Sequence, residues 1–243
     1  MKKISFYLRN LISVFAIYHF KFFSAKRYVE SARRHVGIVN DLNGRVFVDL
    51  SVISQHDAGT GIQRVVRAIA FQLEKAKVKQ EITIIFISFV KERYVRLLVE
   101  DGIYSITDED IDFGDGDMFL GLDFSLDSLW KMRRELIRMR RIGVRFWYVI
   151  YDFLPVIQPQ WFSKRLVLRF SNWLVLMAGT ADRFLCISEP VARQLPQIMK
   201  RHLGVSLCPP AVVMPMGWDL AGSRPSSGLP EGFSDLFEAA FGR

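Results

Sequence analysis

The sequence predicts an α/β fold: a Rossmann-like parallel sheet with helices on both faces, preceded by an N-terminal amphipathic helix. Short runs of β-branched and aromatic residues alternate along the chain with longer segments in which apolar residues recur every three or four positions. One run, residues 81–90, is almost entirely apolar, as expected of a strand buried on both faces. Polar side chains follow several runs directly, where parallel sheets bind their ligands.

Residues 1–40 are expected to form the basic amphipathic segment. The apolar run 11–18 is flanked by Arg9 and Lys21, and it is far shorter than the roughly 20 residues that a membrane-spanning helix needs. Ser24 and Ala25 make a poor signal-peptide cleavage site. Two alternatives stay open: the helix lies on an anionic membrane surface, or it packs on the protein's own core.

The first strand–helix unit spans residues 45–73. Residues 46–48 predict a short buried strand, and Asp49 and Ser51 are the first polar residues beyond it. Thr60 and Gln63 have the spacing of a capping box, which predicts a helix that begins near Gly61.

The loop before this helix contains Gly59 and Gly61. Glycines let a backbone approach a ligand closely, and the first N–H groups of a helix attract anions, so the loop predicts a phosphate or nucleotide site. An ordinary strand–helix turn is the alternative, because the motif is neither a P-loop nor a GxGxxG sequence.

The remaining elements continue the alternation. We expect strands at 81–90, 118–122, 144–151 and 183–187, and helices at 128–141, 162–178 and 189–202. Residues 91–100 are expected to be charged and exposed, residues 101–117 irregular, and the tail from Pro209 loop-rich with a short helix at 233–241. The Rossmann-like domain is placed at 41–215, and residues 216–243 are expected to be a linker.

Four strand ends carry polar side chains, and together they predict one shared cleft: Asp49 with Ser51, Asp123, Asp152, and Ser188 with Glu189. Each residue taken alone is more often a helix cap or turn residue than a catalytic group.

Composition limits the partners. The net charge of +8 permits an anionic partner such as nucleic acid, a membrane surface or a phosphorylated sugar. Nucleic acid is not expected, because no RNA-binding, zinc-finger or heptad pattern occurs. Cys186 and Cys208 form no metal-ligand spacing with histidines, so we expect no metal site, a buried Cys186 and a cytoplasmic location.

Three segments of the chain resemble one enzyme family. The sequence DAGTGIQRVVR at 57–67, YDFLP at 151–155 and ADRFLCISE at 181–189 resemble the N-terminal half of bacterial family 4 glycosyltransferases, in particular mannosyl- and rhamnosyltransferase-like members that build surface polysaccharides. The resemblance covers roughly residue 45 to the end. It implies one half of a GT-B fold, in which two Rossmann-like domains enclose the active site.

The resemblance also implies roles for individual residues. Asp152 is the candidate catalytic group near the reacting hydroxyl. The candidate residues for substrate and diphosphate binding are Asp57, Gly59, Thr60, Gly61, Arg64, Ser188 and Glu189. The donor is a sugar nucleotide, the acceptor is a glycan or a lipid-linked glycan, and neither a cofactor nor a metal is implied.

The family's second domain, which holds the sugar nucleotide, has no counterpart in these 243 residues. Glycosyl transfer requires electrostatic stabilisation of the departing diphosphate, so we expect the isolated chain to be inactive. It would then be a truncated product, or one half of a split enzyme whose donor domain is a separate chain. The alternative is a non-catalytic binding or interaction module. The expected location is cytoplasmic, at the inner face of the cytoplasmic membrane if the N-terminal helix binds lipid.

Overall fold

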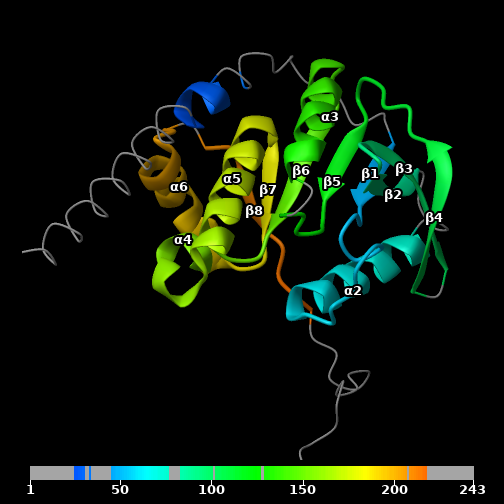
Figure 1. The fold of residues 1–243 in the computed structure, drawn as a ribbon, viewed down its shortest axis with the longest axis horizontal. Helices are drawn as coiled ribbons and strands as arrows, with labels where there is room; N and C mark the ends of the chain where they lie inside the picture. The colour runs from blue at the N-terminus through cyan, green and yellow to red at the C-terminus, as the bar shows by residue number, and fades with distance from the viewer. Residues whose placement is uncertain are drawn as a thin grey trace, which may run out of the picture.

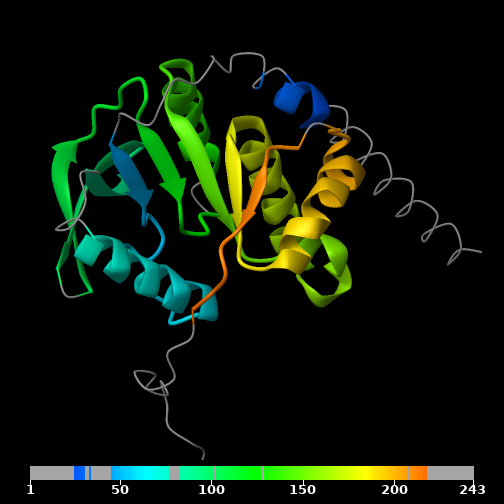
Figure 2. The same cartoon turned by 180° about the vertical axis from the view of Figure 1, so that it is seen from behind.

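The structure is a computed structural model that describes residues 25–30, 33, 45–76, 83–100, 102–126, 129–206 and 208–217. The predicted α/β architecture is confirmed: one sheet lies between helices in both views (Figure 1, Figure 2). Among the described residues, no helix is both long and apolar enough to cross a bilayer.

The sheet has eight strands in the order β4-β3-β2-β1-β5-β6-β7-β8. β2–β3 and β3–β4 pair antiparallel, and every other neighbouring pair is parallel. The strands are β1 Val46–Asp49, β2 Ile84–Val90, β3 Arg93–Glu100, β4 Ile103–Asp110, β5 Met118–Gly121, β6 Arg145–Ile150, β7 Arg183–Cys186 and β8 Ala211–Val213.

The labelled helices connect these strands, and they are α2 Gly61–Ala76, α3 Leu129–Arg141, α4 Leu154–Ile157, the 3-10 helix η1 Pro159–Trp161, α5 Lys164–Thr180 and α6 Glu189–Leu203. The capping box is confirmed, since the Thr60 hydroxyl accepts a hydrogen bond from the Gln63 N–H at 3.3 Å and α2 begins at Gly61. Gly204 ends α6 in the left-handed conformation that favours glycine.

Counted alone, the six parallel strands follow the order 2-1-3-4-5-6, which is a doubly wound, flavodoxin-like arrangement. The chain leaves β1 toward β2 through α2, and it leaves β5 in the opposite direction through α3. The strand order therefore reverses between β1 and β5. In such sheets this point opens a crevice beyond the carboxyl ends of the strands.

Two cores cover the two faces of the sheet. The larger core joins the face that carries Phe47, Phe119 and Phe146 to α3, α5 and α6. Phe119 and Phe146 are in contact there, with ring centroids 5.2 Å apart. On the other face, Val66 and Ala70 of α2 pack over β1 and β2.

The prediction for residues 91–117 was wrong in part. Residues 93–100 form β3, in which Tyr94, Val95, Leu97 and Val99 are buried, and residues 103–110 form the edge strand β4. The turn into β3 is made by Lys91 and Glu92 with φ of 49° and 67°. These residue types do not mark a left-handed turn in a sequence, so the hairpin was missed.

The tail is also more regular than predicted. Residues 211–213 form β8 in parallel with β7, because that edge of the sheet still offers free backbone groups. The short helix α4 and η1 lie within the stretch that the prolines had marked as a loop.

The N-terminal prediction is covered only in part. Residues 25–30 are helical, with Val29 fully buried in the larger core and Arg33 donating to the Ala178 carbonyl at 3.0 Å. This part packs on the protein itself. The rest of the amphipathic segment, and the linker and helix expected beyond residue 217, lie outside the described residues.

The Asp117 side chain links the starts of β1 and β5 by hydrogen bonds and an ion pair. Its carboxylate accepts hydrogen bonds from the backbone N–H groups of Arg45 (2.9 Å) and Gly114 (2.7 Å) and pairs with the Arg45 guanidinium at 2.7 Å. Substitution Asp117→Ala leaves these donors without an acceptor, and we expect it to lower the free energy of unfolding by about 2–4 kcal/mol. Urea denaturation followed by circular dichroism measures this change.

The matched control is Asp108→Ala, which removes an exposed carboxylate from β4. It should change the unfolding free energy by less than about 0.5 kcal/mol. Equal destabilisation by the two substitutions would show that Asp117 does not hold the strands together.

Candidate functional site

The site begins where β1 ends, with Asp49 and Ser51. Both side chains are buried, and the Asp49 carboxylate accepts hydrogen bonds from the N–H (3.1 Å) and the hydroxyl of Ser51. The Ser51 hydroxyl in turn accepts from the Phe89 N–H of β2 at 2.8 Å. These two residues therefore tie the end of β1 to its neighbour.

Asp123 follows β5 and holds the same loop from the other side. Its Oδ2 accepts from the N–H groups of Val52 (2.8 Å) and Ile53 (2.7 Å), and its Oδ1 accepts from the Phe124 N–H (2.8 Å). Burial raises the pKa of Asp123, and these three hydrogen bonds oppose the shift. Asp123 thus joins the two loops that diverge at the crevice between β1 and β5.

A small cavity of about 20 Å³ lies beneath these carboxylates, between the sheet and helices α3 and α5. Asp49, Asp123 and Ser125 line it together with apolar side chains such as Trp173. The Ser125 hydroxyl is buried without a hydrogen-bond partner among the described residues. The cavity has room for about one water molecule, so it is too small for a sugar.

Burial inside this region raises the pKa of Asp49 to about 7, against the hydrogen bonds from Ser51, which lower it. The nearby Asp123 adds to the rise. Asp49 therefore changes its protonation state near neutral pH.

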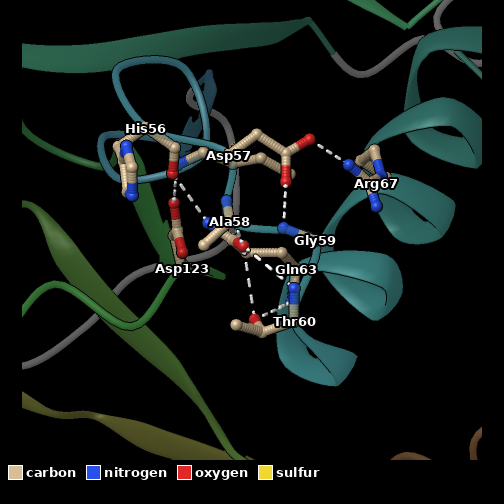
Figure 3. A network of polar contacts seen from close by, with 9 residues as sticks. His56, Asp57, Ala58, Gly59, Thr60, Gln63, Arg67 and Asp123 are labelled. Carbon is tan, nitrogen blue, oxygen red and sulfur yellow. Dashed lines mark hydrogen bonds and ion pairs between the residues drawn. The ribbon is translucent and has the colours of Figure 1, made fainter. Parts of the chain in front are cut away.

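The glycine loop is held by its own side chains (Figure 3). Gln63 Oε1 accepts from the N–H groups of Ala58 (2.9 Å) and Thr60 (3.2 Å), while its Nε2 donates to the His56 carbonyl at 2.8 Å. Asp57 accepts from the Gly59 N–H at 2.9 Å and also pairs with Arg67. The loop is consequently fixed before any ligand binds.

The two glycines differ in what they require. Gly59 has φ +65°, a left-handed conformation that favours glycine. Gly61 has no such conformation, and a Cβ there would meet nothing within 4 Å. Among the hydrogen bonds of the described residues, the N–H groups of Gly61 and Ile62, at the positive end of α2, have no acceptor.

Asp152, the predicted catalytic residue, lies two residues beyond β6 and is half-buried. Its Oδ1 accepts from the Leu154 N–H at 2.9 Å, which starts α4. The carboxylate thus shapes a turn, as the alternative interpretation proposed, and its partial exposure leaves it accessible to a ligand as well.

Ser188 and Glu189 begin α6. Ser188 occupies the position before the first helical residue, but its hydroxyl makes no capping hydrogen bond. Ser188 is half-buried and Glu189 is exposed in the first turn. The Ser188 hydroxyl is therefore not required by the helix it precedes.

The predicted site residues lie at one edge of the sheet, because β1, β5, β6 and β7 run parallel in a regular register. Asp49, Ser51 and Asp123 are joined by hydrogen bonds through the loop after β1. Asp57, Gly59, Thr60 and Gly61 are exposed in the glycine loop, and Arg64 is exposed in the first turn of α2. No direct contact links these residues to Asp152 or Ser188 among the interactions described.

Sequence reasoning missed two features of this site. Gln63 was expected to cap a helix, but it also binds Ala58 and His56 and so shapes the whole loop. Ser125 had no feature that marked it, because its burial arises from the packing of α5 over β5. As for metals, no cluster of three or more His, Cys, Asp or Glu side chains that could hold an ion occurs in the described part of the chain.

The raised pKa of Asp49 predicts a pH-dependent stability. The pKa is about 7 in the folded protein, against 3.8 for an aspartate carboxyl group in water, so the folded state binds the proton more tightly than the unfolded state. The contribution of the protonated Asp49 carboxyl group to the free energy of unfolding is fully present below pH 4, and it is lost as the pH rises to 7. Asp49→Asn should remove the loss, so the variant should gain on the wild type by up to about 1.4 kcal/mol per pH unit across this range.

Urea unfolding of both proteins at a series of pH values measures this gain. Asp108→Asn, an exposed substitution, serves as the control and should follow the wild-type curve. If the curves of Asp49→Asn and the wild type run parallel, Asp49 does not titrate as we expect.

Gln63 should control the order of the glycine loop. Gln63→Ala removes the acceptor shared by Ala58 and Thr60 and the donor to His56, so amide hydrogen exchange in residues 57–60 should accelerate about tenfold or more. Gln55→Ala, in the preceding turn, is the control and should leave these amides unchanged. Slow exchange in the Gln63 variant would mean that other contacts hold the loop.

Comparison with known proteins gives three matches among curated proteins, all of them called serotype-specific mannosyltransferase WbdA of Escherichia coli. The first is 30% identical over 203 residues, which are 80% of this chain and 24% of the relative. The second is 31% identical over 195 residues, which are 77% of this chain and 24% of the relative. No family model and no solved structure matches the chain.

This chain therefore spans about a quarter of the length of the relatives it matches. The matched stretch, 203 residues in the first relative, amounts to most of the present sequence. The resemblance predicted from the glycine loop and the two later motifs is confirmed: the chain is related in sequence to part of the bacterial serotype-specific mannosyltransferases.

Proposed function

We propose that this chain is the acceptor-side half of a glycosyltransferase of GT-B type that builds a cell-surface polysaccharide. The transferred sugar would be a hexose, mannose by analogy with the relatives, and the donor a sugar nucleotide. The donor-binding half would be another domain or a separate chain. The sequence similarity to mannosyltransferases supports the reaction class, and the doubly wound sheet supports the role of a ligand-binding half.

One observation carries the proposal for the donor: the open space above Gly61. The free N–H groups of Gly61 and Ile62 and the dipole of α2 favour an anion there, and the lack of a side chain lets a diphosphate approach. Arg64 in the first turn adds positive charge. Asp57 and Thr60 would act indirectly, since they fix the loop with Gln63.

The acceptor would bind beside β6 and β7. Asp152 would accept a hydrogen bond from the reacting hydroxyl of the acceptor. Its Oδ2 atom is available for this bond, because the Leu154 N–H donates to Oδ1. The Ser188 hydroxyl, free of any capping role, and Glu189 would line the wall of the same cleft. Neither a metal nor an organic cofactor is part of this proposal.

The proposal is tested by glycosyl transfer with the purified chain. GDP-, UDP- and dTDP-sugars are offered with a lipid-linked acceptor, first to the chain alone and then together with a separately expressed donor domain of a relative. Transfer that depends on both chains supports an acceptor-side half. Ligand binding without transfer in either mixture would favour the non-catalytic binding module instead.

Asp152→Asn separates the charge of this residue from its structural role. Asparagine keeps the acceptor for the Leu154 N–H but removes the negative charge, so the fold should be intact while transfer falls about a hundredfold or more. Asp182→Asn, at the opposite edge of the sheet, is a control that should cost stability rather than turnover by folded protein. Wild-type turnover by the Asp152 variant would remove this carboxylate from the proposed site.

A further inference from the structure

Four large apolar side chains are exposed within fifteen residues of the chain, and we call them the α4–α5 patch. They are Leu154 (41% exposed), Ile157 (37%), Trp161 (67%) and Leu168 (43%). They come from α4, η1 and α5, which follow one another directly. In the part of the chain that the structure describes, most other large exposed apolar residues lie at the far edge of the sheet, on β3 and β4.

The core does not need these four side chains. In α4, Pro155 and Val156 are buried, whereas Leu154 and Ile157 are three positions apart and point outward together. In the first turns of α5, Val167 and Phe170 are buried, and Leu168 lies on the outer side. A patch of this kind on a protein surface typically marks a contact with a partner.

The charged side chains within residues 153–181, the segment that carries the patch, are all basic, and Asp152 lies just before this segment. Lys164 and Arg165 are exposed in the first turn of α5, between Trp161 and Leu168 in the sequence. Residues 153–181 contain no Asp or Glu. Because the positive end of a helix dipole repels cations, the position of Lys164 and Arg165 does not stabilise α5. Their placement is better explained by an anionic partner.

We propose that the α4–α5 patch binds the surface of an anionic lipid bilayer. Trp161 and the three aliphatic side chains would enter the boundary between headgroups and acyl chains, as tryptophan and leucine do in interfacial segments. Lys164 and Arg165 would bind the anionic headgroups, with their apolar stems along the membrane surface. The aliphatic residues favour lipid over a carbohydrate, which would be recognised mainly through polar groups.

Helix α4, which carries Leu154 and Ile157 of the patch, lies at the same end of the molecule as the first turn of α2 in both views (Figure 1, Figure 2). Membrane binding through the patch would hold the carboxyl edge of the sheet near the bilayer, where a lipid-linked acceptor is found. Only this consequence rests on the proposed function. The binding itself needs no catalysis and can be tested separately from it.

The test is co-sedimentation of the full chain with vesicles of phosphatidylcholine, with and without phosphatidylglycerol. We expect binding to the anionic vesicles that weakens as salt is added. Ile157→Ser/Trp161→Ser should lower the partition coefficient about tenfold or more. Lys164→Glu/Arg165→Glu should lower it by a similar factor, although acidic residues in the first turn favour the helix.

Matched controls are available on the same chain. Ile103→Ser/Ile106→Ser removes apolar residues of similar exposure from β4, and Lys200→Glu/Arg201→Glu reverses two exposed charges at the other end of α6. Both controls should bind vesicles like the wild type, and circular dichroism verifies that all variants are folded. The N-terminal segment is present in every variant, so differences report on the patch.

Two results would overturn the proposal. One is equal vesicle binding by the wild type and both patch variants, or no binding by any of them. The other is wild-type vesicle binding by Ile157→Ser/Trp161→Ser together with weakened binding of a soluble acceptor glycan, which would identify Trp161 as a sugar platform. Loss of vesicle binding by both patch variants would support the membrane-binding surface even if the wild type failed in the transfer assay. That combination would refute only the proposed reaction.

Discussion

The pairing of β1 with two parallel neighbours is the constraint on which the rest of the structure depends. β1 lies between β2 and β5, and the chain leaves it through a helix on one face and later leaves β5 through a helix on the other. The chain therefore leaves β1 and β5 in opposite directions, and Asp123 after β5 joins the two loops by accepting hydrogen bonds from the loop after β1. The reversal of strand order places Asp49, Ser51 and Asp123, whereas Asp152 and Ser188 follow β6 and β7 further along the same edge of the sheet.

Buried polar groups hold the loops at this point of the sheet. In the loop after β1, the N–H groups of Val52 and Ile53 donate to the Asp123 carboxylate, while the Ser51 hydroxyl accepts from the Phe89 N–H of β2. The buried carboxylates thus serve the architecture first. Burial of Asp49 raises its pKa to about 7, because burial disfavours the charged carboxylate more than the hydrogen bonds from Ser51 favour it.

The groups left for a ligand are those that the fold does not use. Gln63 and Asp57 accept hydrogen bonds from the backbone N–H groups of the glycine loop. The N–H groups of Gly61 and Ile62, at the start of α2, have no such acceptor among the described residues. The Ser188 hydroxyl is likewise not engaged by α6. Because these groups are fixed before binding, a substrate at the carboxyl edge of the sheet would bind to preorganised polar groups. Helix α4 of the α4–α5 patch lies at this same end of the molecule (Figure 1, Figure 2).

The sequence by itself determined the α/β class, the start of α2 at Gly61, and the succession of strands from β5 to β7, because each depends on local periodicity and capping. It could not show the β2–β3 hairpin, whose turn is formed by Lys91 and Glu92, or β8, which needs a neighbouring strand to pair with. It placed polar residues at strand ends. Only the tertiary structure decided that Asp49 and Asp123 are buried supports while Gly61 and Ser188 stay free, since burial and hydrogen-bond partners come from residues distant in the chain.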